Sequence, residues 1–202
     1  ALACSAFVFL LGGGPVEMFC SFIGAGLGNY ARRKMIDRHI TLFAGVAVAV
    51  AVACLSYLLA LSLMQLTFNV SSRHEAGYIG AMLFIIPGFP FITSGLDISK
   101  LDMRSGLERM TYAIAIITVA TLVGWIVALM VNLRPENFQA LPLSALMLFL
   151  LRLPASFCGV FGFSIMFNST PKMASIAGCI GAIANTLRLE LTDLTGIPAG
   201  AA

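Results

Sequence analysis

The sequence predicts an all-α fold, a polytopic bundle of transmembrane helices. Of the 202 residues, 59% are hydrophobic and 10% are charged, against roughly a quarter charged in an ordinary soluble domain. Residues 40–66 and 110–131 contain no Asp, Glu, Lys or Arg. Each segment is longer than the roughly 20 residues that a helix needs to cross the hydrocarbon core of a bilayer. An open sheet at that depth would leave backbone groups unpaired, so both segments are expected to be helices.

Polar or glycine- and proline-containing connectors divide the chain into about seven predicted spans. Their expected ranges, with edges good to a few residues, are 1–11, 16–30, 40–66, 77–96, 107–131, 143–167 and 173–189. The lipid bilayer is therefore the first predicted partner of the chain.

The basic residues predict how this bundle is oriented, because cytoplasmic connectors carry an excess of Lys and Arg. If the spans alternate in direction, one set of connectors holds Arg32, Arg33, Lys34, Arg38, Lys100, Arg104, Arg109 and Lys172, and the other holds Arg73, Arg134 and Arg188. We expect the larger set to be cytoplasmic, which places the N-terminus inside and the turn at residues 12–15 outside.

Composition and motifs argue against several function classes. The net charge of +3 is small and dispersed, which disfavours a nucleic-acid partner. The cysteines lie in apolar segments without a C-x-x-C pair, so we expect buried thiols and no metal site or disulfide; they are Cys4, Cys20, Cys54, Cys158 and Cys179. No Ser/His/Asp or Cys/His set is visible, and we expect neither an enzyme nor a cofactor. We expect the sequence to be part of a longer protein.

Small residues recur at the spacing of helix contact faces. The sets are Gly24 and Gly28, Gly77 and Ala81, and Ala174, Gly178 and Ala182. Such spacing lets helix backbones approach closely in lipid, where no hydrophobic drive brings helices together. The glycine run at residues 24–28 follows no strand, so packing is the preferred interpretation over a nucleotide loop.

The fourth span contains the strongest candidate for a binding site, the motif Pro87-Gly88-Phe89-Pro90. Each proline removes a backbone donor from the helix. Broken helices at membrane depth are tolerated where they are buried in protein or line a watery cavity. In transporters such breaks supply free carbonyls and half-helix N-termini to a substrate.

The prolines would free the carbonyls of Leu83 and Ile86 if the helix continued. Thr93 and Ser94 follow within about one turn, so their hydroxyls would line the same cavity, and the half-helix N-terminus would favour a carboxylate. A proline kink shaped by packing is an alternative of equal weight.

Ionisable residues near or within spans are the next candidates. Arg152 lies in the middle of the sixth span, where an unpaired charge is costly, so we expect it to face the interior and pair with an acid. Glu17, Asp97 and Glu190 are the candidate partners. A structural salt bridge and anion binding both remain possible roles for Arg152. Glu17 is expected to reach the solvated interface.

Residues 83–109 resemble the threonine/serine exporter family, whose split bacterial relatives act in dicarboxylate export. The matching pattern consists of Pro87-Gly88-Phe89-Pro90, Asp97, Lys100-Leu101-Asp102 and Ser105-Gly106-Leu107-Glu108-Arg109. The glycine turn at residues 12–14, the basic pair Arg32-Arg33 and residues 161–168 are similar to the family as well, so the resemblance covers nearly the whole chain. Arg152 is not part of the family pattern and is a departure from it.

The resemblance implies a transporter of ten helices in two five-helix halves that form an inverted repeat. Residues 1–133 would be the first half, and residues 134–202 the first two helices of the second. The missing helices would come from the rest of the protein, from a partner subunit or from a homo-oligomer. The resemblance also implies that the protein lies in the bacterial cytoplasmic (inner) membrane.

The resulting prediction is a secondary transporter that exports a small polar metabolite, threonine or serine, with coupling to the proton gradient; a small dicarboxylate such as succinate is the alternative. Pro87, Gly88, Pro90, Thr93, Ser94 and Arg152 would bind substrate, and Asp97 and Glu17 would act in coupling or gating. A non-transporting scaffold subunit and an intramembrane enzyme are the rivals; the first would need no polar cavity at the break.

The predicted orientation can be tested by labelling single cysteines in a background without the five native ones. S72C is expected to react with an impermeant maleimide on intact cells, whereas S99C is expected to react only after permeabilisation. The reverse pattern would overturn the assignment of the basic connectors to the cytoplasm.

Overall fold

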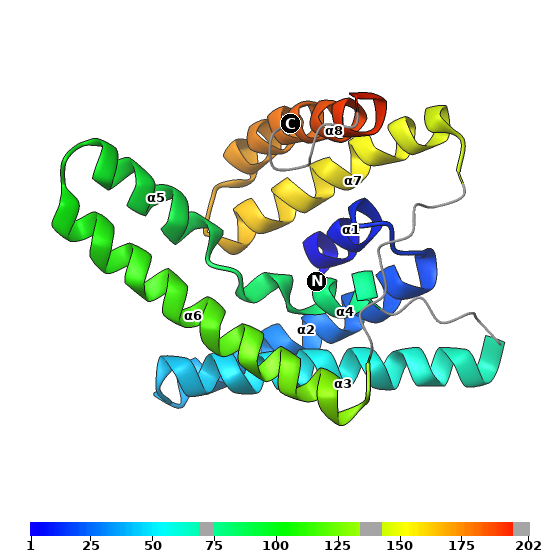
Figure 1. Ribbon diagram of the computed structural model, residues 1–202, viewed down its shortest axis with the longest axis horizontal. Helices are drawn as coiled ribbons and strands as arrows, with labels where there is room; N and C mark the ends of the chain where they lie inside the picture. Colours follow the sequence, from blue (N-terminus) through cyan, green and yellow to red (C-terminus); the bar gives the residue numbers. More distant parts are fainter. Residues whose placement is uncertain (69–74, 134–142, 196–202) are drawn as a thin grey trace.

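The computed structural model describes residues 1–68, 75–133 and 143–195, and all regular structure in these ranges is helical (Figure 1). The helices are α1 (Leu2–Leu10), α2 (Pro15–Asp37), α3 (Leu42–Phe68), α4 (Glu75–Met82), the 3-10 turn η1 (Leu83–Ile85), α5 (Gly88–Ser99), α6 (Met103–Met130), α7 (Ala145–Met166) and α8 (Pro171–Thr195). The predicted all-α bundle is confirmed.

Helices α1 to α4 and α6 surround the main core, in which α2 and α3 make the closest approach. A Cβ atom at Gly28 would lie 2.7 Å from the Cβ of Ala53, and one at Gly24 would lie 2.8 Å from the Ala53 carbonyl oxygen. Only glycine permits these distances, since real Cβ atoms need more than 3 Å. The predicted packing role of the small residues is therefore confirmed at this contact.

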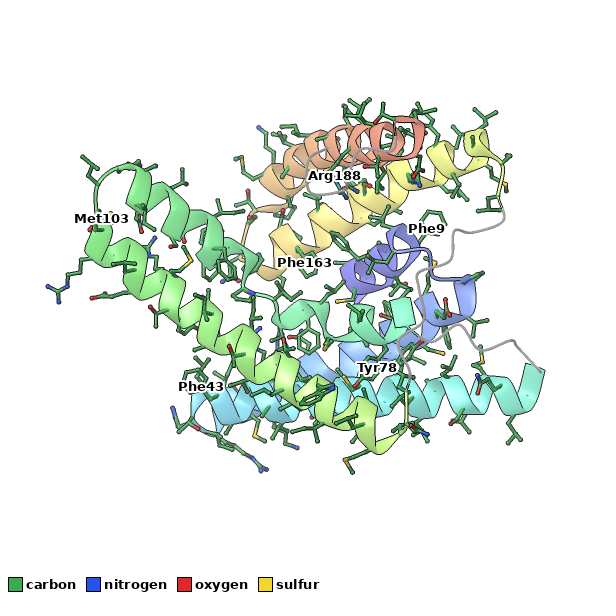
Figure 2. The ribbon with its side chains drawn as sticks, in the orientation of Figure 1. Phe9, Phe43, Tyr78, Met103, Phe163 and Arg188 are labelled. Atoms are coloured by element: carbon green, nitrogen blue, oxygen red, sulfur yellow. The ribbon has the colours of Figure 1, made fainter. Side chains whose placement is uncertain are left out.

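Two helical hairpins complete the bundle. Helices α5 and α6 pack on each other, as do α7 and α8, where Gly178 lies directly against the Phe157 ring. The α7–α8 hairpin joins the rest through α1: Phe163 of α7, labelled in Figure 2, packs on Phe7 with ring centroids 5.5 Å apart.

In the part of the chain that the structure describes, three helices are long and apolar enough to cross a membrane, namely α3, α6 and α7. A fourth candidate is the pair 76–85 and 88–99, if the two bent pieces form one span. Helix α1 has nine residues, and α2 and α8 carry clusters of charged residues near their C-terminal ends. The chain is thus a multi-pass membrane protein in which three or four of the seven expected spans meet criteria of length and composition.

The basic segment at residues 31–34 was expected to be a connector, and this expectation is wrong. Helix α2 continues through it to Asp37, because Arg, Lys and Met are good helix formers and no glycine or proline interrupts them. The turn follows instead at His39, whose φ of 54° ends the helix.

The connections α2–α3, α5–α6 and α7–α8 lie toward one end of the bundle, on the left in Figure 1, whereas the α1–α2 turn lies toward the other. The basic residues assigned to the cytoplasm in the predicted topology therefore gather at one end.

Candidate functional site

The fourth expected span is broken at the proline motif, as predicted. Helix α4 ends in η1, Ile86 adopts an extended conformation with ψ of 121°, and Pro87 caps the new helix α5. The two pieces meet at an angle of 58°. Pro87 is buried and Gly88 half-buried, and a Cβ added at Gly88 would have no other atom within 4 Å.

The carbonyls next to the break find partners within the chain itself. The Ile86 amide donates to the Leu83 carbonyl at 3.1 Å, and the Gly88 amide donates to the Ile86 carbonyl at 2.9 Å. As expected, the two carbonyls lose their usual helical partners at the prolines, and a tight turn supplies other donors in their place. Each carbonyl still has a second lone pair that can accept another donor.

The two hydroxyls that follow the break point in different directions. Thr93 is half-buried and its hydroxyl lies 3.1 Å from the carbonyls of both Phe89 and Pro90 in its own helix. Ser94 is fully buried and donates to the Gly106 carbonyl of α6 at 2.7 Å. Thr93 thus stays beside the break, whereas Ser94 fastens α5 to α6.

Asp97 and Arg109 form an ion pair across the α5–α6 hairpin. Their side chains approach to 3.0 Å and are 23% and 52% exposed, respectively. At the connection, Asp102 caps α6 by accepting the Ser105 amide at 3.3 Å. Hydrogen bonds from the Ser105 hydroxyl and amide hold the pKa of Asp102 below its ordinary value. The ion pair and the cap hold this end of the hairpin together.

Glu17 lies inside the bundle, and the expectation that it reaches the solvated interface is wrong. The residue is 5% exposed, and its carboxylate accepts the Gly14 amide at 2.6 Å. It therefore caps α2 at the turn that follows α1, where a negative charge is favourable. The buried side chains of Cys20 and Tyr57 lie near enough to interact electrostatically with it.

Arg152 is charge-paired, as predicted, and it pairs with two acids of α8. One guanidinium nitrogen lies 2.7 Å from Glu190 and the other 2.7 Å from Asp193. Arg152 is 14% exposed and Glu190 22%. Next to this triad, Asn185 donates to Ser156 at 2.8 Å and accepts from Arg188, which lies between α7 and α8 in Figure 2.

The structure brings together only some of the expected site residues. Phe89 of the break stacks on Phe167 at the end of α7, with centroids 5.8 Å apart. Arg152 lies fifteen residues earlier in the chain, a rise of roughly 22 Å along a helix. It is therefore remote from Pro87 along α7. Phe167 and Asp193 were missed. For Asp193, the available signal was its spacing of three residues from Glu190, which puts both acids on one helix face.

No group of three or more His, Cys, Asp or Glu side chains is arranged to hold a metal ion within residues 1–68, 75–133 and 143–195. What the described arrangement offers is a helix break with a buried proline and a half-buried glycine, a buried carboxyl group and two sets of ion pairs. Such groups can bind a small polar molecule or exchange a proton.

Comparisons with known proteins agree with this arrangement. A family model described as "Putative threonine/serine exporter" matches residues 1–132. The "Probable succinate transporter subunit YjjP" of Escherichia coli (strain K12) is 28% identical over 136 residues, which cover 63% of the chain and 48% of that protein. The chain thus matches about half the length of this curated relative. No solved structure gives a significant match.

The Arg152 triad generates a prediction about stability. Arg152→Gln is expected to lower the free energy of unfolding by about 3 kcal/mol, the lower end for breaking a buried pair, because it leaves two carboxylates close together. Thermal unfolding in detergent measures the loss, and the second substitution Glu190→Gln is expected to recover part of it.

The exposed pair of Arg104 and Glu108 provides the control. Arg104→Gln is expected to change the melting temperature little, since exposed pairs contribute little. If Arg152→Gln melts like the wild type, the triad does not stabilise the α7–α8 hairpin.

Proposed function

Since the chain belongs to the threonine/serine exporter family, we propose that the protein is a secondary transporter that exports a small polar metabolite, threonine or serine, at the expense of the proton gradient. The observation that supports this most is the break between η1 and α5, where a buried proline interrupts a candidate span. Substrate sites of secondary transporters are typically formed by discontinuous helices of this kind.

The proposed site is formed by Pro87, Gly88 and Pro90, with Thr93 beside them. The open space around Gly88 leaves its backbone accessible. Proline has no amide, and the amides of Gly88 and Phe91 are already used in backbone bonds. The amide of Phe89 has no backbone acceptor within the described ranges, so it can donate to a carboxylate.

Ser94 and Arg152 have weaker support as substrate ligands. Ser94 supports the site indirectly, because its bond to Gly106 fixes α5. The contacts of Arg152 with Glu190 and Asp193 favour a structural salt bridge. With its charge neutralised, Arg152 is no obstacle to a neutral amino acid as substrate.

Glu17 is the proposed coupling carboxyl group and Asp97 the proposed gating residue. Glu17 is buried in the core and can exchange a proton without exposing a charge to lipid. Asp97 is held by Arg109 at the end of the hairpin that contains the proposed cytoplasmic connector. Breaking this ion pair would loosen α5 from α6 at that end.

A small dicarboxylate is the second candidate substrate, favoured by the similarity to a protein named as a probable succinate transporter subunit. That relative is a subunit and is matched over 48% of its length. We therefore propose that residues 1–133 form the first five-helix half and 134–202 begin the second. The remaining helices come from further sequence, a partner subunit or a second copy. The proposed location is the bacterial inner membrane, N-terminus inside.

The double substitution P87A/P90A tests the site, because alanine restores both amides and lets the helix continue. Counterflow of labelled threonine, serine and succinate in proteoliposomes of the full-length protein is expected to fall at least tenfold, with the amount of folded protein unchanged. P154A, which removes the proline inside α7, is the matched control and is expected to transport normally. Normal counterflow by P87A/P90A would favour packing or a scaffold role.

Glu17→Gln tests proton coupling separately from substrate binding. Glutamine keeps the size and the cap to Gly14 but cannot release a proton, so counterflow is expected to persist while transport driven by a pH gradient is lost. Glu108→Gln, on the exposed face of α6, is the control and is expected to retain both activities. If Glu17→Gln still responds to an imposed pH gradient, the proton is carried by another group.

A further inference from the structure

The end of α2 carries a dense group of positive charges that the transport proposal does not use. Arg32, Arg33, Lys34 and Arg38 lie within seven residues, against the single negative charge of Asp37. Within the described ranges none of the four basic residues forms an ion pair, although Arg104, Arg109 and Arg152 all do. These four positive charges therefore remain available to a partner outside the chain.

Apolar side chains surround the same charges. Tyr30, Ile36 and Phe43 are 64%, 56% and 47% exposed, and the Lys34 ammonium lies 5.9 Å from the centre of the Tyr30 ring. Long basic side chains that lie over exposed apolar surface are typical of the boundary between hydrocarbon and headgroups. Phe43, at the start of α3, marks the position of this surface in Figure 2.

A shallow hollow lies between the end of α2 and the start of α3. Its lining includes Arg32, Ile36, Ile40 and Thr41. Arg32 and Ile36 are one helical turn apart and both line the hollow, in which Arg32 is the charged residue among mainly apolar neighbours. A ligand that carries a negative charge next to an apolar portion matches the basic cluster and the apolar hollow together, and a free metabolite anion lacks the apolar portion.

We propose that this surface, defined by Arg32, Arg33, Lys34, Arg38 and the hollow, binds an anionic phospholipid. The lipid phosphate contacts Arg32 at the hollow, with the other three basic residues around it. An acyl chain lies over Ile36 and Ile40. Basic clusters directly beside a membrane helix attract anionic headgroups by this combination of charge and proximity. The proposal is independent of the transported substrate.

The test compares binding of phosphatidylglycerol and phosphatidylcholine by the full-length protein, measured as lipid retained in native mass spectrometry and as thermal stabilisation. Wild type is expected to retain phosphatidylglycerol selectively. R32Q/R33Q is expected to lower its affinity about fivefold per charge removed, the size expected for a basic residue at an anionic surface. K100Q/K172Q removes two charges from the same end of the bundle and is expected to change the affinity little.

Two further arms locate the site and identify the ligand. R32Q is expected to lower retention more than R33Q, because Arg32 lines the hollow. Inorganic phosphate at millimolar concentration is expected neither to stabilise the protein nor to displace the lipid, since it lacks an acyl chain. Equal losses in the two double variants, equal retention of both lipids, or displacement by phosphate would each overturn the proposal.

Discussion

Helix α6 determines the geometry of the break, because it is bonded to the chain on both sides of it. On α4, the Tyr78 hydroxyl donates to the Gly124 carbonyl at 2.6 Å. On α5, the Ser94 hydroxyl donates to the Gly106 carbonyl at 2.7 Å. Eighteen residues of continuous helix, roughly 27 Å, separate these two carbonyls. The angle between α4 and α5 is therefore held by a long rigid helix. A conformational change that alters this angle at Gly88 must break one of the two buried hydrogen bonds or move α6 as well.

The close contact between α2 and α3 forms a rigid core, and a conformational change at the break would move α5 relative to this core. The approach at Gly24 and Gly28 brings Ala53 into direct contact with the α2 backbone, and close contact of this kind is how helices associate in lipid. Gly28 also lies against the Phe84 ring of η1. The segment before the break is thus packed into the rigid core, whereas α5 contacts mainly α6. The two sides of the break differ in how firmly they are held.

The helices, the break and the charge pairing of Arg152 could be predicted from sequence because each follows from a local rule. Long apolar runs, paired prolines and the cost of an unpaired charge in lipid act wherever they occur. The continuation of α2 through residues 31–34 follows from local helix propensity, whereas the positions of Glu17 and Ser94 depend on longer-range geometry. Whether Glu17 is solvated depends on how α1 folds back over α2, and whether Ser94 faces a cavity depends on the rotation of α5 against α6. No periodicity or motif in the sequence encodes the rotation of α5 against α6 or the way in which α1 folds back over α2. The carbonyls of Leu83 and Ile86 lose their helical partners at the prolines, as a local rule predicts, and the turn at Ile86 supplies other donors.

The pairing of charges within the helices bears on which substrate the bundle accepts. Arg109 is engaged by Asp97, Arg152 by Glu190 and Asp193, and Arg188 by Asn185. A zwitterionic amino acid adds no net charge, so it could occupy the break with only backbone and hydroxyl partners for its two ends. A dicarboxylate brings two negative charges and needs compensating cations close by, or such charges are expensive in a low dielectric. Of these cations, Arg109 and Arg152 would have to leave an existing acid partner to compensate a second carboxylate, whereas the proposed donor, the Phe89 amide, can serve a single carboxylate. These pairings support the proposal of threonine or serine as the substrate, and a dicarboxylate would require a cation that is released from its partner or supplied from elsewhere in the assembly.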